Sequence, residues 1–329
     1  MNTYYHQNCS NIDLFEMGAD TLVPFARNKT RAFSNVHFRI RSMKEQDLTR
    51  VNHLLDDKKW IMEKAYLDCA FKTNPRDFDV AETVDREIIG CYSSLSFTDN
   101  LYVSGLWIVH KDYRSSSVGY KLAKTINRFP DRNYAGFIWP HMQDKINMIT
   151  KSNTTQAYTT WYNSGRIEQH VDLNPRHKHE EQVLIHPLKH STLSAVIQYD
   201  TQIHKVPRKA YIINWISNPQ SKTYVAVKDG KLCGYAVLRF QDTCLQIAPL
   251  YANNEYVANE VFLKIASEVP KGCVVGFTSP LENNAATKLA ARYGMMGQGM
   301  PLLMVFRHDP IHLDINKIYA LSSTSFGLC

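Results

Sequence analysis

The segment WIVHKDYRSSSVGYKLAK, Trp107–Lys124, contains the change of structure that decides the fold. It begins with an apolar run typical of a buried strand, passes through a charged corner and three serines, and continues as an amphipathic helix. The first N–H groups of a helix have no partner inside the helix and lie at its positive end, so a junction of this kind can bind a phosphate. Gly119 leaves the most room for such an anion.

Two alternatives remain open for the polar residues of this junction. Arg114 adds a permanently charged, planar set of donors, and Ser115 and Ser116 can donate their hydroxyl groups to a ligand. In the simpler alternative, Ser115–Ser117 only cap the helix, since serine is common at helix starts. The local spacing by itself favours the simpler interpretation.

The chain also repeats itself once. PDRNYAGFIWP at Pro130–Pro140 and PKGCVVGFTSP at Pro270–Pro280 share the pattern P-x5-G-F-x-x-P. Further matches follow at a slightly different offset, namely Asn74-Pro75 with Asn218-Pro219, Asp85 with Asp229, and Gly90 with Gly234. A single repeat of this length indicates a duplicated domain rather than a solenoid, whose units are far shorter.

The order of elements is the same in both copies. In the second copy two apolar runs meet across Asp229-Gly230, which predicts a hairpin, and Val257, Val261, Ile265 and Val269 share one helical face. For the first copy we expect strands at His37–Lys44, Asp77–Val84, Glu87–Phe97, Leu101–Val109 and Tyr134–Trp139, helices at 45–57, 117–128 and 143–153, and a closing hairpin within 156–173.

We therefore expect an α/β chain with two tandem domains, each built on a mixed, mostly antiparallel sheet flanked by helices. The predicted parts are an N-terminal extension (1–35), domain 1 (36–173), a linker (174–182), domain 2 (183–309) and a C-terminal tail (310–329).

Composition narrows the class of protein. The 329 residues have a net charge of +7 that is spread along the chain, so we expect an anionic ligand and no nucleic-acid partner. No apolar run is long enough for a membrane span, and the N-terminus lacks the pattern of a secretory signal. The seven cysteines are dispersed, which indicates reduced thiols and a cytoplasmic protein.

The junction resembles motif A of the GNAT N-acyltransferase superfamily, V-x-P-x-[YF]-R-x-x-G-x-[GA]-x-x-L. Val109, Tyr113, Arg114, Gly119 and Leu122 are in register, whereas Lys111 and Ser117 depart from the motif. The resemblance implies an N-acetyltransferase that uses acetyl-CoA as acyl donor. It implies that the loop amides bind the pyrophosphate and the preceding strand binds the pantetheine. The implied cofactor-binding residues are Trp107, Ile108, Val109, Arg114, Ser115, Ser116, Ser117, Val118, Gly119 and Tyr120.

The second copy is similar to a YitH/HolE-type GNAT domain over YVAVKDGKLCGYAVLR, IAPLYANNEYVANEVF and NNAATKLAARYGM. Its phosphate loop is poor, because Asn253, Tyr256 and Ala258 take the positions of the arginine, the first glycine and the second small residue. Glu255 would also place a carboxylate beside the phosphate. We therefore expect the first copy to bind the CoA.

No catalytic residue can be assigned. The strand before motif A has no carboxylate, and Asp99 precedes it; the tyrosine common in the family is replaced by Ile149 and Ala290. Tyr158 and Tyr162 are nearby, but strand packing is the simpler explanation for them. The histidines of the linker region could bind a metal, yet a solvated linker explains them better, so no metal site is predicted.

Two functions from different classes follow. The first is an acetyl-CoA-dependent N-acetyltransferase acting on a small-molecule or protein amine. The second is a catalytically inactive CoA- or ligand-binding scaffold with the same tandem fold. Neither the acceptor nor the oligomeric state can be inferred from the sequence.

Overall fold

The computed structural model describes residues 36–56, 61–167, 183–240 and 244–328. Their strands form one 13-stranded sheet in the order β1-β2-β3-β4-β5-β12-β6-β11-β10-β9-β8-β7, with β13 paired to β10. Only β4 with β5 and β10 with β11 pair in parallel. The expected fold class, a mixed and mostly antiparallel sheet flanked by helices, is confirmed. The predicted N-terminal extension (1–35) and the predicted linker (174–182) lie outside the described residues.

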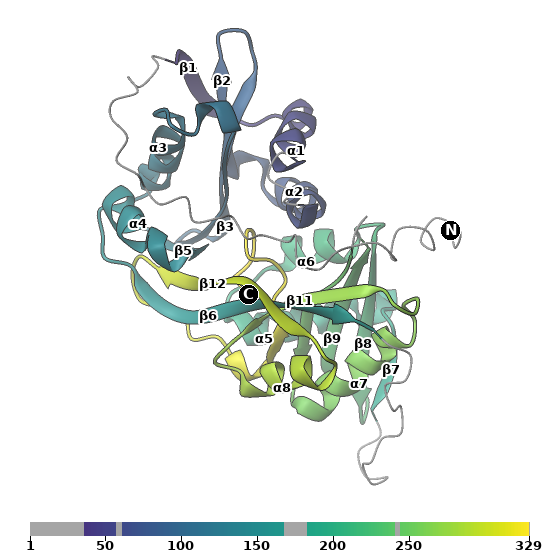
Figure 1. Ribbon diagram of the computed structural model, residues 1–329. Coiled ribbons are helices and arrows are strands. Elements are labelled where there is room, and N and C mark those ends of the chain that lie inside the picture. Colours follow the sequence, from purple (N-terminus) through teal and green to yellow (C-terminus); the bar gives the residue numbers. More distant parts are fainter. Residues whose placement is uncertain (1–35, 57–60, 168–182, 241–243, 329) are drawn as a thin grey trace.

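The first half contains β1 (Phe38–Ser42), α1 (Leu48–Asp56), α2 (Ile61–Thr73), β2 (Phe78–Thr83), β3 (Ile88–Thr98), β4 (Leu101–Val109), α3 (Val118–Ala123), β5 (Asn133–Ile138), α4 (Gln143–Thr150) and β6 (Thr155–Arg166). In Figure 1, α1 and α2 cover one face of these strands, and α3 and α4 cover the other.

The second half contains β7 (Leu184–Pro187), α5 (Leu193–His204), α6 (Lys209–Ile216), β8 (Ser221–Lys228), β9 (Lys231–Phe240), β10 (Leu245–Ala252), α7 (Glu255–Ala266), β11 (Val274–Pro280), α8 (Asn284–Arg292), β12 (Met296–Phe306) and β13 (Ile318–Ala320). The predicted hairpin joins β8 to β9, and Asp229 and Gly230 both have positive φ, as its tight turn requires. No helix among the described residues is long and apolar enough to cross a membrane.

The two halves exchange their closing strands. β6, from the first half, pairs with β11 over Thr160–Arg166, while β12, from the second half, pairs with β5 over Leu303–Phe306. The two exchanged strands also pair with each other (Figure 1). One continuous sheet therefore runs through both halves.

The predicted closing hairpin within 156–173 is wrong, because β6 is a single uninterrupted strand from Thr155 to Arg166. The segment Asn163-Ser164-Gly165 suggested a turn. A Cβ added at Gly165 would instead lie 3.0 Å from the carbonyl oxygen of Gly294, so this glycine permits a close approach to the turn between α8 and β12. Pairing on both sides keeps the strand extended.

The repeated segments occupy equivalent strands, as predicted, since Pro130–Pro140 contains β5 and Pro270–Pro280 contains β11. The phenylalanines of the two segments nevertheless lie on different faces of the sheet. Phe137 packs with Tyr158 in the core that α1 and α2 cover, whereas Phe277 packs on Phe262 of α7, the counterpart of α3. A shift of one residue turns a side chain to the opposite face of a sheet. The P-x5-G-F match therefore identifies the strand and misaligns it by one position.

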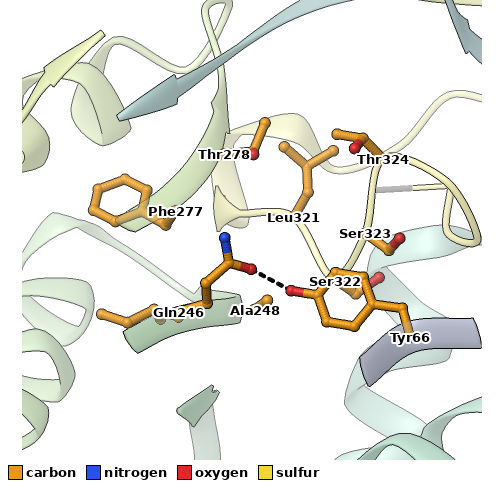
Figure 2. Close-up of a pocket in the computed structure, with 10 residues that line it drawn as sticks. Tyr66, Gln246, Ala248, Phe277, Thr278, Leu321, Ser322, Ser323 and Thr324 are labelled. Atoms are coloured by element: carbon orange, nitrogen blue, oxygen red, sulfur yellow. Dashed lines mark hydrogen bonds between the residues drawn. The ribbon is translucent and has the colours of Figure 1, made fainter. Parts of the chain in front are cut away.

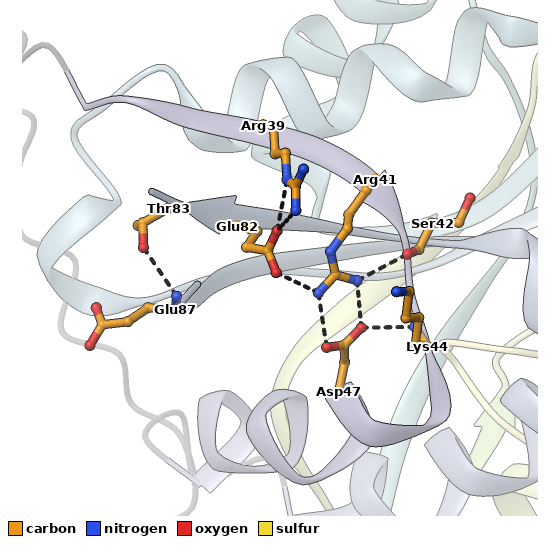
Figure 3. A network of polar contacts seen from close by, with 8 residues as sticks. All are labelled: Arg39, Arg41, Ser42, Lys44, Asp47, Glu82, Thr83 and Glu87. Carbon is orange, nitrogen blue, oxygen red and sulfur yellow. Dashed lines mark hydrogen bonds and ion pairs between the residues drawn. The ribbon is translucent and has the colours of Figure 1, made fainter. Parts of the chain in front are cut away.

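A network of charges fixes the start of the first half (Figure 3). Glu82 on β2 accepts hydrogen bonds of 2.8 Å from both Arg39 and Arg41 on β1. Arg41 also donates to both carboxylate oxygens of Asp47, at 2.6 and 3.0 Å, and Asp47 accepts from the backbone N–H of Lys44. This network ties the edge strand β1 to its neighbour and to the turn that leads into α1.

The network predicts a loss of stability in acid. Hydrogen bonds from Arg41 and Arg39 lower the pKa of Glu82 from 4.5 to about 2. A lowered folded-state pKa contributes stability above the unfolded value, which is lost as the pH falls from about 4.5 towards 2. Glu82→Gln is expected to lower the free energy of unfolding at pH 6 and to reduce its pH dependence in this window, as measured by urea unfolding. Glu87→Gln, on the same hairpin, is the control; an equal effect of both variants would contradict the prediction.

Candidate functional site

β4 and β5 pair only over their first four residues and then separate. The last pair is Ser104 with Gly136, and β4 continues to Val109 with no strand on that side among the described residues. We call this divergence, past Ser104 on β4 and Gly136 on β5, the first splay. Backbone N–H and C=O groups on this side of β4 are available to a ligand, because strand polar groups need a partner.

The connection from β4 to α3 is a compact loop of consecutive turns. Arg114 Nε donates to the carbonyl oxygen of Val109 at 3.1 Å, and Ser116 Oγ donates to the carbonyl oxygen of Tyr113 at 2.6 Å. Within the described residues, no hydrogen bond involves the backbone N–H of Ser117 or Gly119, and the Ser117 side chain caps nothing. These N–H groups can therefore donate hydrogen bonds to an anion.

The side chains implied by the resemblance divide into two groups. Ile108 and Val118 are buried and support the strand and the helix. Trp107 lies over the loop, where its Nε1 donates to the carbonyl oxygen of Gly119 at 3.1 Å. Arg114, Ser115 and Tyr120 are exposed, and Val109, Ser116, Ser117 and Gly119 are partly so.

Lysines surround this loop. Lys145 Nζ of α4 lies 5.2 Å from the centre of the Trp107 ring, and Lys124 Nζ lies 4.5 Å from that of Tyr120. Lys111 and Lys121 are on the loop and on α3 themselves. The local positive charge favours a ligand that carries several negative charges.

The second half has the same divergence, past Gln246 on β10 and Gly276 on β11, but it is filled. We call it the second splay. β13 pairs with β10 there, with Leu250 opposite Ala320 and Tyr251 opposite Ile318. On the other side, the N–H of Leu321 donates to the carbonyl oxygen of Thr278 on β11 at 2.8 Å. A strand from the chain's own C-terminal segment, 310–329, thus occupies this space.

The connection in the second half is also too short to form a phosphate loop. Only Asn253 and Asn254 separate β10 from α7. Asn254 caps the helix by accepting from the N–H of Val257 at 3.0 Å. Tyr256 and Ala258, which take the small-residue positions of the motif, lie within α7, and Glu255 is paired with Arg292 at 2.7 Å. The start of this helix therefore has its own polar partners.

A small pocket, with room for little more than a water molecule, lies beside the second splay. Figure 2 shows Tyr66 of α2 donating to Gln246 of β10 beneath the segment Leu321–Thr324. The hydroxyl groups of Ser322, Ser323 and Thr324 line the same space. A pocket of this size cannot accept an extended cofactor.

In the second half, the face of the sheet that α5 covers contains a buried ion pair. Arg208 donates to both carboxylate oxygens of Asp200, at 3.0 and 2.7 Å, and Tyr235 donates to the same carboxylate at 2.8 Å. His204 Nδ1 bonds the carbonyl oxygen of Asp200 at 2.8 Å. Burial alone would raise the pKa of Asp200, but Arg208 and His204 hold it below its usual value. This paired and buried network leaves no open acid–base group.

The residues weighed as catalytic groups lie outside the first splay or are buried. Asp99 is exposed in the turn before β4, and Ile149 and Ala290 are buried on α4 and α8. Tyr158 donates its hydroxyl to the carbonyl oxygen of Leu328, and burial raises the pKa of Tyr162. Of the buried carboxylates on β2, Asp79 is paired with Arg128 and Glu82 with two arginines. No general acid or base is therefore assigned.

Several of the linker histidines, namely His170, His177 and His179, lie outside the described residues. His186 is partly exposed and His190 is exposed. In the part of the chain that the structure describes, no three His, Cys, Asp or Glu side chains are grouped as a metal ion would need. Five cysteines of the described residues are buried, namely Cys69, Cys91, Cys233, Cys244 and Cys273.

Comparison with known proteins supports both the fold and the family. Residues 196–320 match the model of the acetyltransferase (GNAT) domain. Over 230 residues the chain is 22% identical to holothin acyltransferase of Pseudoalteromonas sp., which covers 70% of this chain and 74% of that protein.

Solved structures show the same fold at low sequence identity. A Pyrococcus horikoshii protein assigned as an acetyltransferase superposes with a TM-score of 0.70 at 14% identity, over 92% of this chain and 100% of its own. A tandem GNAT protein from the clavulanic acid biosynthesis pathway gives a TM-score of 0.58 at 12% identity, over 84% and 100% of the two chains. N-myristoyltransferase of Saccharomyces cerevisiae gives 0.56 at 12% identity, over 89% and 86%.

The difference between the two splays can be tested by hydrogen exchange of the free protein. Leu250 and Tyr251 pair with strands on both sides, whereas among the described residues Trp107–Val109 have a strand on one side only. We expect peptides covering 250–252 to exchange more slowly than peptides covering 107–109, because exchange reports the opening of each hydrogen bond. Equal protection in the two strands would mean that the first splay is not open.

Proposed function

We propose that the chain is a tandem protein of the GNAT acyltransferase superfamily and transfers the acetyl group of acetyl-CoA to an amine. The observation that carries this proposal is the contrast between the two splays. The first is open beside a loop with free N–H groups, while β13 fills the second. We accordingly assign one CoA to each chain, bound in the first half.

The cofactor would use the residues implied by motif A. The pyrophosphate would accept hydrogen bonds from the N–H groups of Ser117 and Gly119, with Arg114 and the surrounding lysines supplying positive charge. The pantetheine would run along Trp107–Val109 and satisfy the open edge of β4. The indole of Trp107, which lies between Gly119 and Lys145, would form one wall of the path.

The reaction is a displacement at the thioester carbonyl. The neutral nitrogen of the amine attacks the carbonyl carbon, a C–N bond forms, and the C–S bond breaks with CoA leaving as a thiolate. The nitrogen loses a proton and the thiolate takes one up. The buried carboxylates are paired with arginines, which favours transfer of these protons through water.

The same pairing of carboxylates supports the second candidate, a CoA- or ligand-binding scaffold without catalysis. CoA binding alone would fit both candidates. Release of free CoA thiol in the presence of a cognate amine separates them, because a scaffold releases none. The similarity to holothin acyltransferase favours acyl transfer and leaves the acceptor open. The seven cysteines are dispersed along the sequence, which is typical of proteins in a reducing compartment, and we place the protein in the cytoplasm.

We retain the division into a first domain at 36–173 and a second at 183–309 as a proposal. The equivalent positions of β5 and β11, each parallel to one neighbour, support an origin by duplication. The exchange of β6 and β12 means that these domains share one sheet.

The proposal predicts that Gly119→Glu strongly weakens CoA binding. A Cβ at this position would lie 3.4 Å from Val109 and 3.7 Å from Trp107, so the side chain can be accommodated without disturbing the core. Its carboxylate would lie at the N–H groups assigned to the pyrophosphate. Loss of a charged hydrogen bond, about 1.5–3 kcal/mol, corresponds to a roughly tenfold to hundredfold weaker affinity. Titration calorimetry with CoA measures the change.

Thr287→Glu adds the same charge on the exposed side of α8 and is the control, with circular dichroism to verify folding of both variants. We expect the unmodified chain and the Thr287 variant to bind one CoA. Undiminished affinity in a folded Gly119→Glu variant would exclude the first half as the site.

A further inference from the structure

We propose that the C-terminal residues Ser325–Leu328 form a wall at the closed end of the first splay and restrict the acyl group to a short one. This inference rests on the proposed function, since it concerns the acyl group of a CoA bound in the first half. It makes the C-terminal segment part of both splays: β13 fills the second, and the residues that follow it border the first.

Gly105 shows how close this segment comes. It is the first residue of β4 after the last pair with β5. A Cβ added to Gly105 would overlap the carbonyl oxygen of Ser325 and lie 2.9 Å from Ser93 Oγ. Only glycine allows the two backbones to approach in this way. The C-terminal segment therefore lies directly against β4 where the splay begins.

The segment is firmly held in this position. The N–H groups of Ser325 and Phe326 donate to Ser323 Oγ at 3.0 and 3.1 Å. The Phe326 side chain is fully buried, with its ring centre 6.1 Å from that of Phe78. Tyr158 of β6 donates its hydroxyl to the carbonyl oxygen of Leu328. The wall thus belongs to the core that α1 and α2 cover.

The end of the first splay is also closed on the face of the sheet that α3 covers. A Cβ at Gly136 would lie 2.7 Å from the hydroxyl of Tyr134, and Tyr92 and Ser104 share a 2.6 Å hydrogen bond. Both tyrosines are buried. A group that arrives at the end of the splay therefore meets hydroxyl groups on the α3 side and the C-terminal segment on the α1 side.

The direction of the cofactor brings its acyl group to this place. With the pyrophosphate at the loop, the pantetheine runs back along β4 from Val109 to Gly105. Four residues of strand measure roughly 13 Å. The thioester would then lie near Gly105, where an acetyl group has little space beyond it.

Of the two sides, the C-terminal segment is the one held by side-chain contacts and not by strand pairing. The hydroxyl cluster comes from β3, β4 and β5, which are paired along their lengths. The segment after Ala320 contains no helix or strand among the described residues. Acyl length should accordingly depend on the side chain of Phe326.

The test is a calorimetric titration of CoA, acetyl-CoA and hexanoyl-CoA into the full chain and into Phe326→Leu. We expect hexanoyl-CoA to bind the unmodified chain about tenfold or more weakly than acetyl-CoA, and Phe326→Leu to reduce this ratio to about threefold or less. Phe262→Leu makes the same change in the core of the second half and should leave the ratio unaltered.

Equal binding of the two acyl-CoAs by the unmodified chain would overturn the inference, as would an unaltered ratio in Phe326→Leu. If CoA itself does not bind, the proposed function is wrong, and the inference about the wall fails with it. If Phe326→Leu does not fold, hydrogen exchange of the unmodified chain decides. Hexanoyl-CoA should then increase exchange in peptides covering 321–328 and acetyl-CoA should not, and identical exchange with both would refute the wall.

Discussion

Every backbone N–H and C=O group of a strand needs a hydrogen-bond partner, and this requirement determines the structure of both splays. Where a parallel neighbour diverges, the edge of the longer strand loses its hydrogen bonds. The second half restores them with β13, which pairs with β10 and continues to β11. Among the described residues, the first half leaves the edge of β4 without a strand. Two related arrangements thus differ in what satisfies the same backbone groups, and the function that we propose for the first half rests on this difference.

The surroundings of the two splays agree with that difference. In the first half, eight residues connect β4 to α3. Within the described part of the chain, the N–H groups of Ser117 and Gly119 at this connection have no acceptor. In the second half, two asparagines suffice and one of them caps the helix. The buried pair of Asp200 and Arg208 completes the second half as a structural unit. A buried ion pair is costly to break, and the Asp200 carboxylate here also accepts a hydrogen bond from Tyr235. This favours a rigid structural role for the second half over a catalytic one.

Local signals in the sequence predicted local structure well. Asp229-Gly230 specified the hairpin of β8 and β9, and the bounds of β4 were predicted correctly, because turn chemistry and hydrophobic periodicity act over a few residues. The junction at Ser115–Gly119 was identified for the same reason. What the sequence did not reveal depends on distant partners. β6 was predicted as a hairpin because its second neighbour, β12, begins at Met296. β13 was assigned to a tail, since three residues carry no periodic signal.

The exchange of closing strands has a consequence for how the chain folds. β5 has only β4 beside it until β12 arrives, and the pairs that join Ile138 to Leu303 span about half the chain. Such distant contacts slow folding, because a long loop must close before they form. During synthesis the first half would leave the ribosome with an incomplete sheet and an exposed edge on β5, a state prone to aggregation. Translation of the last strands is therefore the step at which both halves become stable together.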